Sequence, residues 1–305
     1  MAENRYNMIV KRIVLIILSL MILAGCAEES SGNEEEIASY PTSPAVTRDE
    51  VLHSVFDDYT DASIVDLSLS TASDGYIGAA LKEEDGSKVK MRIVKDDMTY
   101  TYDVSSTEMI AYPLQMGDGT YLIKVLEQIE GTSYAVVFSK EINVSFADEM
   151  SVYLYPNQVV DYDNSDMVID ISFDKVKDDD NDLKRVYDLY RYVLKALDYD
   201  NEKAKNVADI YTLPDIEDSI ERGKGICFDY ASLLAALCRI QHIPARVIVG
   251  YTDIEYHAWC EIFLENEGWI NPKFFFNGQD WSTVDPTFAD SGQDYEGNYD
   301  EVYRY

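Results

Sequence analysis

The chain has 305 residues, which is enough for about two domains of ordinary size. Its 25 Lys and Arg residues stand against 57 Asp and Glu residues, so the formal net charge is −32 at pH 7. A charge of this sign argues against nucleic acids and against anionic membrane surfaces as electrostatic partners. It is compatible with a very soluble protein or with one adapted to salty surroundings, and it does not identify a ligand.

The first 26 residues have the pattern of an export signal. Basic residues precede an apolar run over residues 13–22, which is too short for a comfortable membrane span. The sequence Leu-Ala-Gly-Cys at residues 23–26 resembles a bacterial lipobox, which implies cleavage before Cys26 and lipidation of its thiol. The alternative is an ordinary cleaved signal peptide. In both cases we expect an exported chain, and a lipidated Cys26 would hold it on the outer face of a bacterial cytoplasmic membrane.

The next two segments differ sharply in composition. Residues 27–50 are rich in Glu, Ser, Gly, Asn and Pro, so we expect an acidic, solvated tether. Over residues 51–150, short alternating runs recur between turn residues, which predicts a small all-β domain resembling an immunoglobulin-like sandwich. This domain is predicted to be a spacer, or else a module that presents a substrate or binds the cell wall. Its predicted strands are residues 76–81, 89–94, 98–104, 121–128, 134–138 and 141–146.

Residues 151–305 mix helical and strand patterns, which predicts an α+β domain. Residues 227–240 are apolar almost all round and rich in Ala and Leu, so they are predicted to form a buried helix. The alternation over residues 256–263 predicts a strand with His257, Trp259 and Glu261 on one face. The tail from residue 291 is expected to pack loosely. Further predicted elements are helices over residues 182–197 and 215–221, and strands over residues 168–171, 246–251 and 281–284.

Cys227 is predicted to begin the buried helix, where the helix dipole and free N–H groups favour a thiolate. A buried structural cysteine is the alternative, because free cysteine is among the most buried residue types. His257 on one strand and Asp285 at the end of another could supply the base and the orienting carboxylate that a thiol nucleophile needs. Asp280 and Asp290 are alternatives for the carboxylate. Asp285 is preferred because the proline after it restrains the chain there.

The motifs around these residues resemble the transglutaminase-like superfamily. The resemblance runs from about residue 182 to about residue 290 and implies a papain-like α+β core with a triad of Cys227, His257 and Asp285. The connection between the histidine and the aspartate is longer than in the shortest family members. The motifs are, in chain order, Gly225-x-Cys227-x-Asp229-Tyr230-Ala231, Ile243-Pro244-Ala245-Arg246, His257-Ala258-Trp259-x-Glu261 and Asp285-Pro286-Thr287.

The resemblance implies acyl transfer on an amide carbonyl by a thiolate. The acyl-enzyme could meet water or an amine, so a cysteine peptidase or amidase and a cross-linking acyltransferase both stay open. The expected substrate is a peptide or protein, with cell-wall peptides suggested by the exported location. Tyr230, Trp259 and Trp281 are candidate substrate contacts, with core packing as the alternative. The rival from another class is a non-catalytic cell-surface binding or scaffold module that keeps the fold.

The four cysteines also bear on chemistry. If Cys26 carries lipid, three remain, so at least one thiol is unpaired, as a reactive nucleophile would be. Cys238 and Cys260 lie in apolar surroundings and are expected in the core. The sequence holds neither a Cys-x-x-Cys nor a His-x-x-x-His pair, so we predict no zinc site and no other cofactor.

Overall fold

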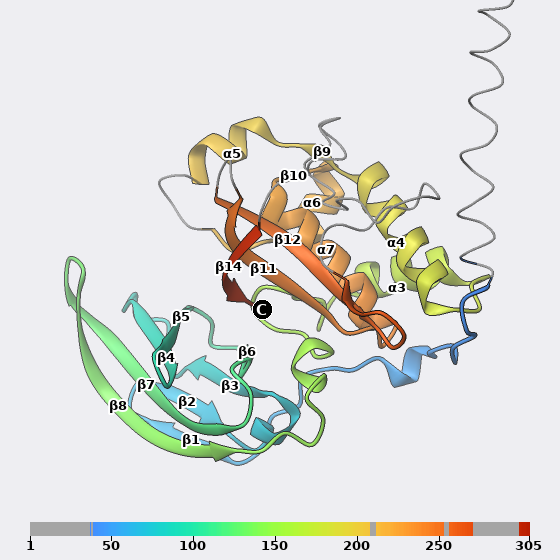
Figure 1. Cartoon of the computed structure of the whole chain (residues 1–305). Helices are drawn as coiled ribbons and strands as arrows, with labels where there is room; N and C mark the ends of the chain where they lie inside the picture. The colour runs from blue at the N-terminus through green and yellow to red at the C-terminus, as the bar shows by residue number, and fades with distance from the viewer. Residues whose placement is uncertain (1–36, 38, 208–211, 253–255, 271–298) are drawn as a thin grey trace, which may run out of the picture.

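The computed structural model of this chain describes residues 37, 39–207, 212–252, 256–270 and 299–305 (Figure 1). These residues form an all-β domain followed by a domain of helices and strands, and the C-terminal end of the chain lies between the two. Within the described part, no helix is both long enough and apolar enough to cross a membrane. The order of an all-β domain before an α+β domain agrees with the fold class expected from the sequence.

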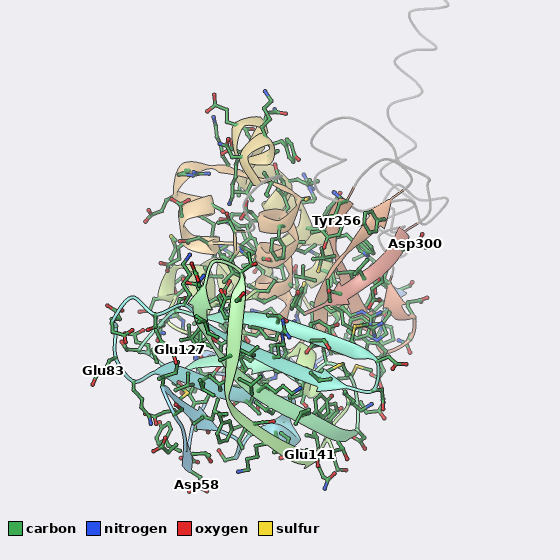
Figure 2. All side chains as sticks on the ribbon, turned by 90° about the vertical axis from the view of Figure 1, so that its left-hand side faces the viewer. Asp58, Glu83, Glu127, Glu141, Tyr256 and Asp300 are labelled. Atoms are coloured by element: carbon green, nitrogen blue, oxygen red, sulfur yellow. The ribbon has the colours of Figure 1, made fainter. Side chains whose placement is uncertain are left out.

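The first domain consists of two four-stranded antiparallel sheets, ordered β1-β2-β3-β6 and β5-β4-β7-β8. Their inner faces share one core, in which Leu67, Ile93 and Ile123 are fully buried. Acidic side chains such as Asp58 and Glu83 are exposed at its margins (Figure 2). The strands are β1 (Tyr59–Ala62), β2 (Val65–Ser68), β3 (Tyr76–Leu81), β4 (Val89–Lys95), β5 (Met98–Val104), β6 (Ile110–Pro113), β7 (Gly119–Glu130) and β8 (Ser133–Val144).

The strand order of this domain is close to that of an immunoglobulin-like sandwich. If β2 corresponds to the first strand, A, of that fold, then the neighbours β3 and β6 correspond to the neighbouring strands B and E. In the other sheet, the neighbours β4, β7 and β8 then correspond to strands C, F and G. One strand was divided wrongly by the sequence pattern. The predicted run 134–138 and most of the run 141–146 belong to the single strand β8, because Ser139 and Lys140, between the two runs, also pair with β7.

The second domain is built around α7, which is apolar on all sides. Helices α3 and α4 pack on one side of it, and the face of β11 and β12 packs on the other (Figure 1). Burial of each large side chain in such a core contributes about 1.5–3 kcal/mol. The elements are α3 (Asp166–Val176), α4 (Asp182–Ala196), β9 (Asp198–Tyr199), α5 (Asn201–Val207), α6 (Ile216–Arg222), β10 (Lys224–Gly225), α7 (Cys227–Ile240), β11 (Ala245–Thr252), β12 (Tyr256–Leu264), β13 (Gly268–Ile270) and β14 (Tyr299–Arg304).

Two predictions for this domain are wrong. The expected strand over residues 168–171 is part of α3, which begins where the Ser165 side chain accepts the N–H of Val168 at 3.2 Å. A short apolar run does not distinguish a strand from a buried helix turn. The tail expected to pack loosely ends in β14, which pairs antiparallel with β11 at the edge of the sheet ordered β13-β12-β11-β14.

The described part of the predicted tether lies against the second domain. The Asn181 side chain donates to the carbonyl oxygen of Ile37, and the Arg185 guanidinium donates to the Ser43 hydroxyl and to the Pro44 carbonyl oxygen. Arg185 is only 2% exposed, so these contacts satisfy a buried cation. Residues 37 and 39–50 therefore contact the second domain at these points, although most of their side chains are exposed.

A second buried arginine connects distant segments of the same domain. Arg239, near the end of α7, has no exposed surface, and its burial lowers the pKa of the guanidinium to about 10. It donates to the main-chain oxygens of Ala245 at 2.8 Å, Tyr155 at 2.6 Å and Tyr305 at 3.0 Å. At neutral pH the group is charged, and it holds the end of α7, the start of β11 and the end of the sheet together.

We expect Arg239→Met to lower the free energy of unfolding by at least about 2 kcal/mol, because three buried acceptors lose their donor. The exposed Arg191 on α4 provides a matched control, and Arg191→Met should change stability by about 0.5 kcal/mol or less. Urea unfolding followed by tryptophan fluorescence measures this, since all three tryptophans belong to the second domain. Equal losses in the two variants would contradict the role given to Arg239.

Candidate active site

Cys227 is the first residue of α7, and it is the residue of that helix that reaches solvent. Its side chain is partly exposed, whereas Cys238 and Cys260, the other cysteines of the described residues, are buried. Ile226 precedes it in an extended conformation, with φ −103° and ψ 176°, so the chain enters the helix abruptly. The first N–H groups of a helix have no partner within the helix, and Cys227 is the first residue at that end of α7.

The turn that presents Cys227 is shaped by Asp229 and Gly225. One Asp229 carboxylate oxygen accepts the main-chain N–H of Ile226 at 2.8 Å. A Cβ atom on Gly225 would lie 2.8 Å from the Asp229 Cβ atom and 3.3 Å from the same carboxylate oxygen. Glycine at position 225 is therefore what allows the carboxylate to fold back under the chain that leads to the cysteine.

A buried ion pair holds Asp229 in place. Asp229 is 1% exposed, and its two carboxylate oxygens accept from the Lys203 ammonium at 2.8 and 2.7 Å. Lys203 belongs to α5, and Asp200, just before α5, donates its N–H to the Gly225 carbonyl oxygen at 2.8 Å. The sequence indicated neither α5 nor Lys203 as part of this region. No local pattern shows which lysine will pair with a carboxylate 26 residues away.

His257 is the second residue of β12, is 2% exposed, and lies opposite Gly250 of β11. Strand alternation places it on the face of Trp259 and Glu261, as expected from the sequence. On that face the Glu261 carboxylate accepts from the Arg246 guanidinium at 2.8 and 2.6 Å. His257 therefore shares this face of the sheet with Trp259 and with the Arg246–Glu261 ion pair.

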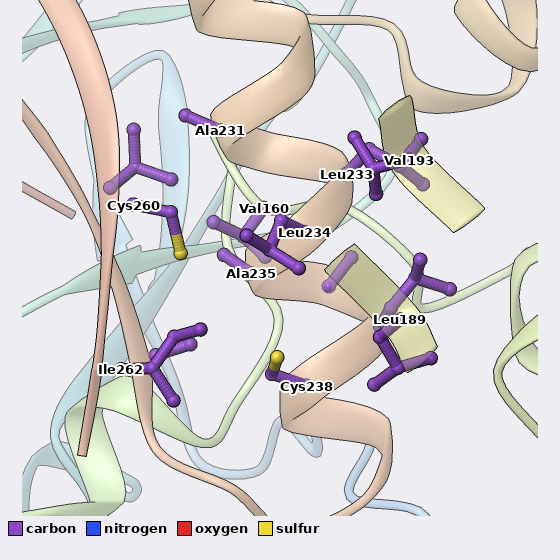
Figure 3. Close-up of a cluster of buried hydrophobic side chains, with 14 of the residues drawn as sticks. Val160, Leu189, Val193, Ala231, Leu233, Leu234, Ala235, Cys238, Cys260 and Ile262 are labelled. Atoms are coloured by element: carbon purple, nitrogen blue, oxygen red, sulfur yellow. The ribbon is translucent and has the colours of Figure 1, made fainter. Parts of the chain in front are cut away.

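The helix α7 and the strand β12 run in the same direction. Figure 3 shows Ala231 and Cys260 at one end of their contact, and Cys238 and Ile262 at the other. The candidate nucleophile lies about one helical turn before Ala231, and the candidate histidine lies three residues before Cys260. Both therefore lie at the same end of the layer formed by the helix and the strand.

The electrostatic surroundings of Tyr256 agree with this arrangement. Partial burial raises the pKa of the Tyr256 hydroxyl, and Tyr303, Tyr251 and Cys227 each raise it further through charge repulsion. Such an effect requires that Cys227 lie near the start of β12. Tyr256 directly precedes His257, so the thiol and the histidine belong to the same end of the sheet, although strand alternation turns the His257 side chain to the face opposite Tyr256.

The other predicted site residues are placed differently. Tyr230 is fully buried, and its hydroxyl donates to the Leu197 carbonyl oxygen at 2.7 Å. Trp259 is 2% exposed, and its indole N–H donates to Glu261 at 3.3 Å. Both positions fit the alternative of core packing, because neither side chain has surface exposed for contact with a substrate. Trp281, Asp285 and Cys26 lie outside the described residues.

A cavity of about 770 Å³ lies between the two domains, and neither Cys227 nor His257 is among its lining residues. Its lining includes Arg246 and Trp269, and the Arg246 guanidinium lies 4.1 Å from the centre of the Trp269 ring. Arg246 lies opposite Glu261, four positions along β12 from His257, whereas Glu301, which also lines the cavity, pairs with Gly250, the strand partner of His257.

We expect Lys203→Met to destabilise the protein by on the order of 3 kcal/mol, because Asp229 would stay buried without its cation. The exposed Lys205 on the same helix is the matched control, and Lys205→Met should have little effect. Adding Asp229→Asn to Lys203→Met should restore part of the loss, because the uncompensated charge is then removed. Urea unfolding of Lys203→Met, Asp229→Asn, their double variant and Lys205→Met tests this, and additive effects in the double variant would contradict a direct ion pair.

Residues 169–286 match the sequence model of the Transglutaminase-like superfamily. This segment extends from α3 past β13 and includes Cys227, His257 and Asp285. A stretch of 95 residues is 30% identical to the Uncharacterized protein YebA of Bacillus subtilis (strain 168). It covers 24% of this chain and 13% of YebA, so the chain spans only a small part of that relative.

Two solved structures are also similar to this chain. A candidate cysteine protease from Cytophaga hutchinsonii is 14% identical with a TM-score of 0.35, covering 75% of this chain and 91% of that one. The periplasmic domain of TgpA from Pseudomonas aeruginosa is 14% identical with a TM-score of 0.31, covering 81% and 76%. Similarities with TM-scores this low do not establish a shared fold, so the family of the second domain is assigned from the sequence match alone. The second domain of this chain is a domain of the transglutaminase-like superfamily.

Proposed function

We propose that this chain is an exported, lipid-anchored cysteine enzyme that transfers or hydrolyses acyl groups at amide bonds. The observation that carries the proposal is the position of Cys227. It is a partly exposed thiol at the N-terminus of a helix whose other residues are all buried, within a transglutaminase-like domain. The position of His257 at the same end of the sheet supports it.

In the proposed reaction, the Cys227 thiolate attacks the carbonyl carbon of an amide, and His257 takes the thiol proton. The N–H of Cys227, at the first position of α7, is the proposed donor to the oxyanion that forms. The C–N bond then breaks, and His257 returns the proton to the departing amine, leaving a thioester. Water or a second amine releases the acyl group. Asp285 is the proposed residue that orients the imidazole.

The proposed substrates are peptides or proteins outside the cytoplasmic membrane, cell-wall peptides among them. The formal charge of −32 disfavours strongly acidic substrates, because they would be repelled as they approach. Hydrolysis and amine transfer both fit the proposed thioester. Mass spectrometry of peptide products distinguishes them, since hydrolysis adds the atoms of water to the acyl group, whereas transfer adds the amine and no water.

Cys227→Ser should abolish activity and labelling by iodoacetamide at position 227, while the fold persists. Cys238→Ser is the matched control and should leave both unchanged, because Cys238 has no exposed surface and its burial raises the pKa of its thiol. His257→Ala should slow labelling of Cys227 near neutral pH by at least about 10²-fold, since the general base is lost. Mass spectrometry of the peptide containing Cys227 gives the rates, and circular dichroism checks folding.

Two results would count against this assignment. Equal loss of activity in Cys227→Ser and Cys238→Ser would show that Cys227 is not the nucleophile. Labelling of Cys227 at the same rate with and without His257 would favour the non-catalytic binding or scaffold module instead.

The proposed lipid anchor has its own test. In cells given radiolabelled palmitate, the full chain should become labelled, and Cys26→Ala should be unlabelled and released from the membrane fraction. Cys227→Ser serves as the control and should be labelled like the unaltered chain, because the proposed lipid attachment involves only Cys26. A labelled Cys26→Ala protein would exclude Cys26 as the site of lipid attachment.

A further inference from the structure

Two tyrosine rings are exposed side by side next to the candidate active site. Tyr251 of β11 and Tyr256 of β12 are directly paired across the two strands. They are 55% and 53% exposed, their ring centres lie 5.0 Å apart, and their planes are inclined by 59°. Aromatic rings are costly to leave in water, so an exposed pair beside a candidate nucleophile calls for an explanation.

The face on which these rings stand explains why they are exposed. Val249 and Ala258 belong to the same face of the sheet and are buried under α7. Tyr251 and Tyr256 continue that face by one more pair of residues, beyond the point at which α7 begins. The helix therefore does not cover them, and Cys227, at its first position, lies beside them.

We propose that Tyr251 and Tyr256 form a subsite that receives an aromatic side chain of the acyl-donor peptide, next to the amide that reacts with Cys227. This inference rests on the proposed function and specifies its substrate class. A third ring within the subsite would stack on, or meet edge-on, the two tyrosines, which contributes about 0.5–1.5 kcal/mol for an aromatic pair.

Nearby charge narrows the choice of side chain. Asp300 of β14 lies opposite Tyr251, and Figure 2 shows Asp300 and Tyr256 at the same margin of the second domain. An acidic side chain would be repelled there. A basic side chain would be attracted, but salt screens the attraction between exposed charges, whereas it does not screen the contact between neutral rings. A neutral aromatic side chain is therefore the preferred occupant.

The test uses two alkylating probes that share one reactive group, iodoacetamide and N-benzyl-iodoacetamide. The ratio of their labelling rates at Cys227, measured by mass spectrometry, reports whether a ring beside the reacting atom is bound. Tyr256→Ala should lower the benzyl-to-plain ratio by about 2- to 12-fold, the range that corresponds to one aromatic pair. Tyr256→Phe should keep the ratio, because the ring is retained. Tyr251→Ala should act like Tyr256→Ala.

Tyr59, which is 62% exposed on β1 of the other domain, provides the matched control. Tyr59→Ala should leave the ratio unchanged, and an equal fall there would overturn the proposed subsite. So would an unchanged ratio in both Tyr251→Ala and Tyr256→Ala, or a preference for an aminoethyl probe over the benzyl probe. Plain iodoacetamide tests the proposed function separately. If it labels Cys227 in a His257-dependent way while the ratios do not change, only the subsite is wrong.

Discussion

The second domain depends on the complete burial of α7. Every residue of this helix after Cys227 is buried, between α3 and α4 on one side and the β11–β12 face on the other. A helix without a polar face cannot slide or tilt without exposing apolar surface or opening cavities, both of which are costly. Its first residue is therefore held at a fixed place on the surface of the domain. That constraint is what makes a cysteine at this position suitable for chemistry.

Burial also separates the polar side chains of α7 from water, so each needs a hydrogen-bond partner within the protein. The two ends of α7 provide these partners in different ways. At the N-terminal end, Asp229 accepts the Ile226 N–H and pairs with Lys203, so a carboxylate and an ammonium are buried together. At the C-terminal end, Arg239 is surrounded by main-chain oxygens of three segments instead of a carboxylate. The first arrangement ties α7 to segments before it in the chain, and the second ties it to segments both before and after it. They fix the helix along its axis as well as sideways.

The strand β14 connects this domain with the all-β domain. The Gln115 side-chain amide donates to the Arg304 carbonyl oxygen at 2.9 Å, and the Arg304 N–H donates to the Tyr100 hydroxyl at 3.2 Å. Tyr303 and Tyr305 also pack against the core of the first domain. The β domain is therefore held beside the sheet that carries His257. This arrangement suits a module that faces the same substrates as the second domain, as well as a spacer.

The sequence alone determined the elements whose pattern is local. The apolar residues of α7, the helical spacing of α4 and the alternation of β12 each predicted the observed element, because burial imposes its period on neighbouring residues. It also indicated Cys227 and His257 through motifs that the family match covers. The tertiary structure alone decided that Lys203 meets Asp229, that β14 pairs with β11, and that Arg185 binds the segment expected to be a tether. These contacts join residues that are far apart along the chain. They depend on how the whole domain packs, and the local periodicity of the sequence contains no information about them.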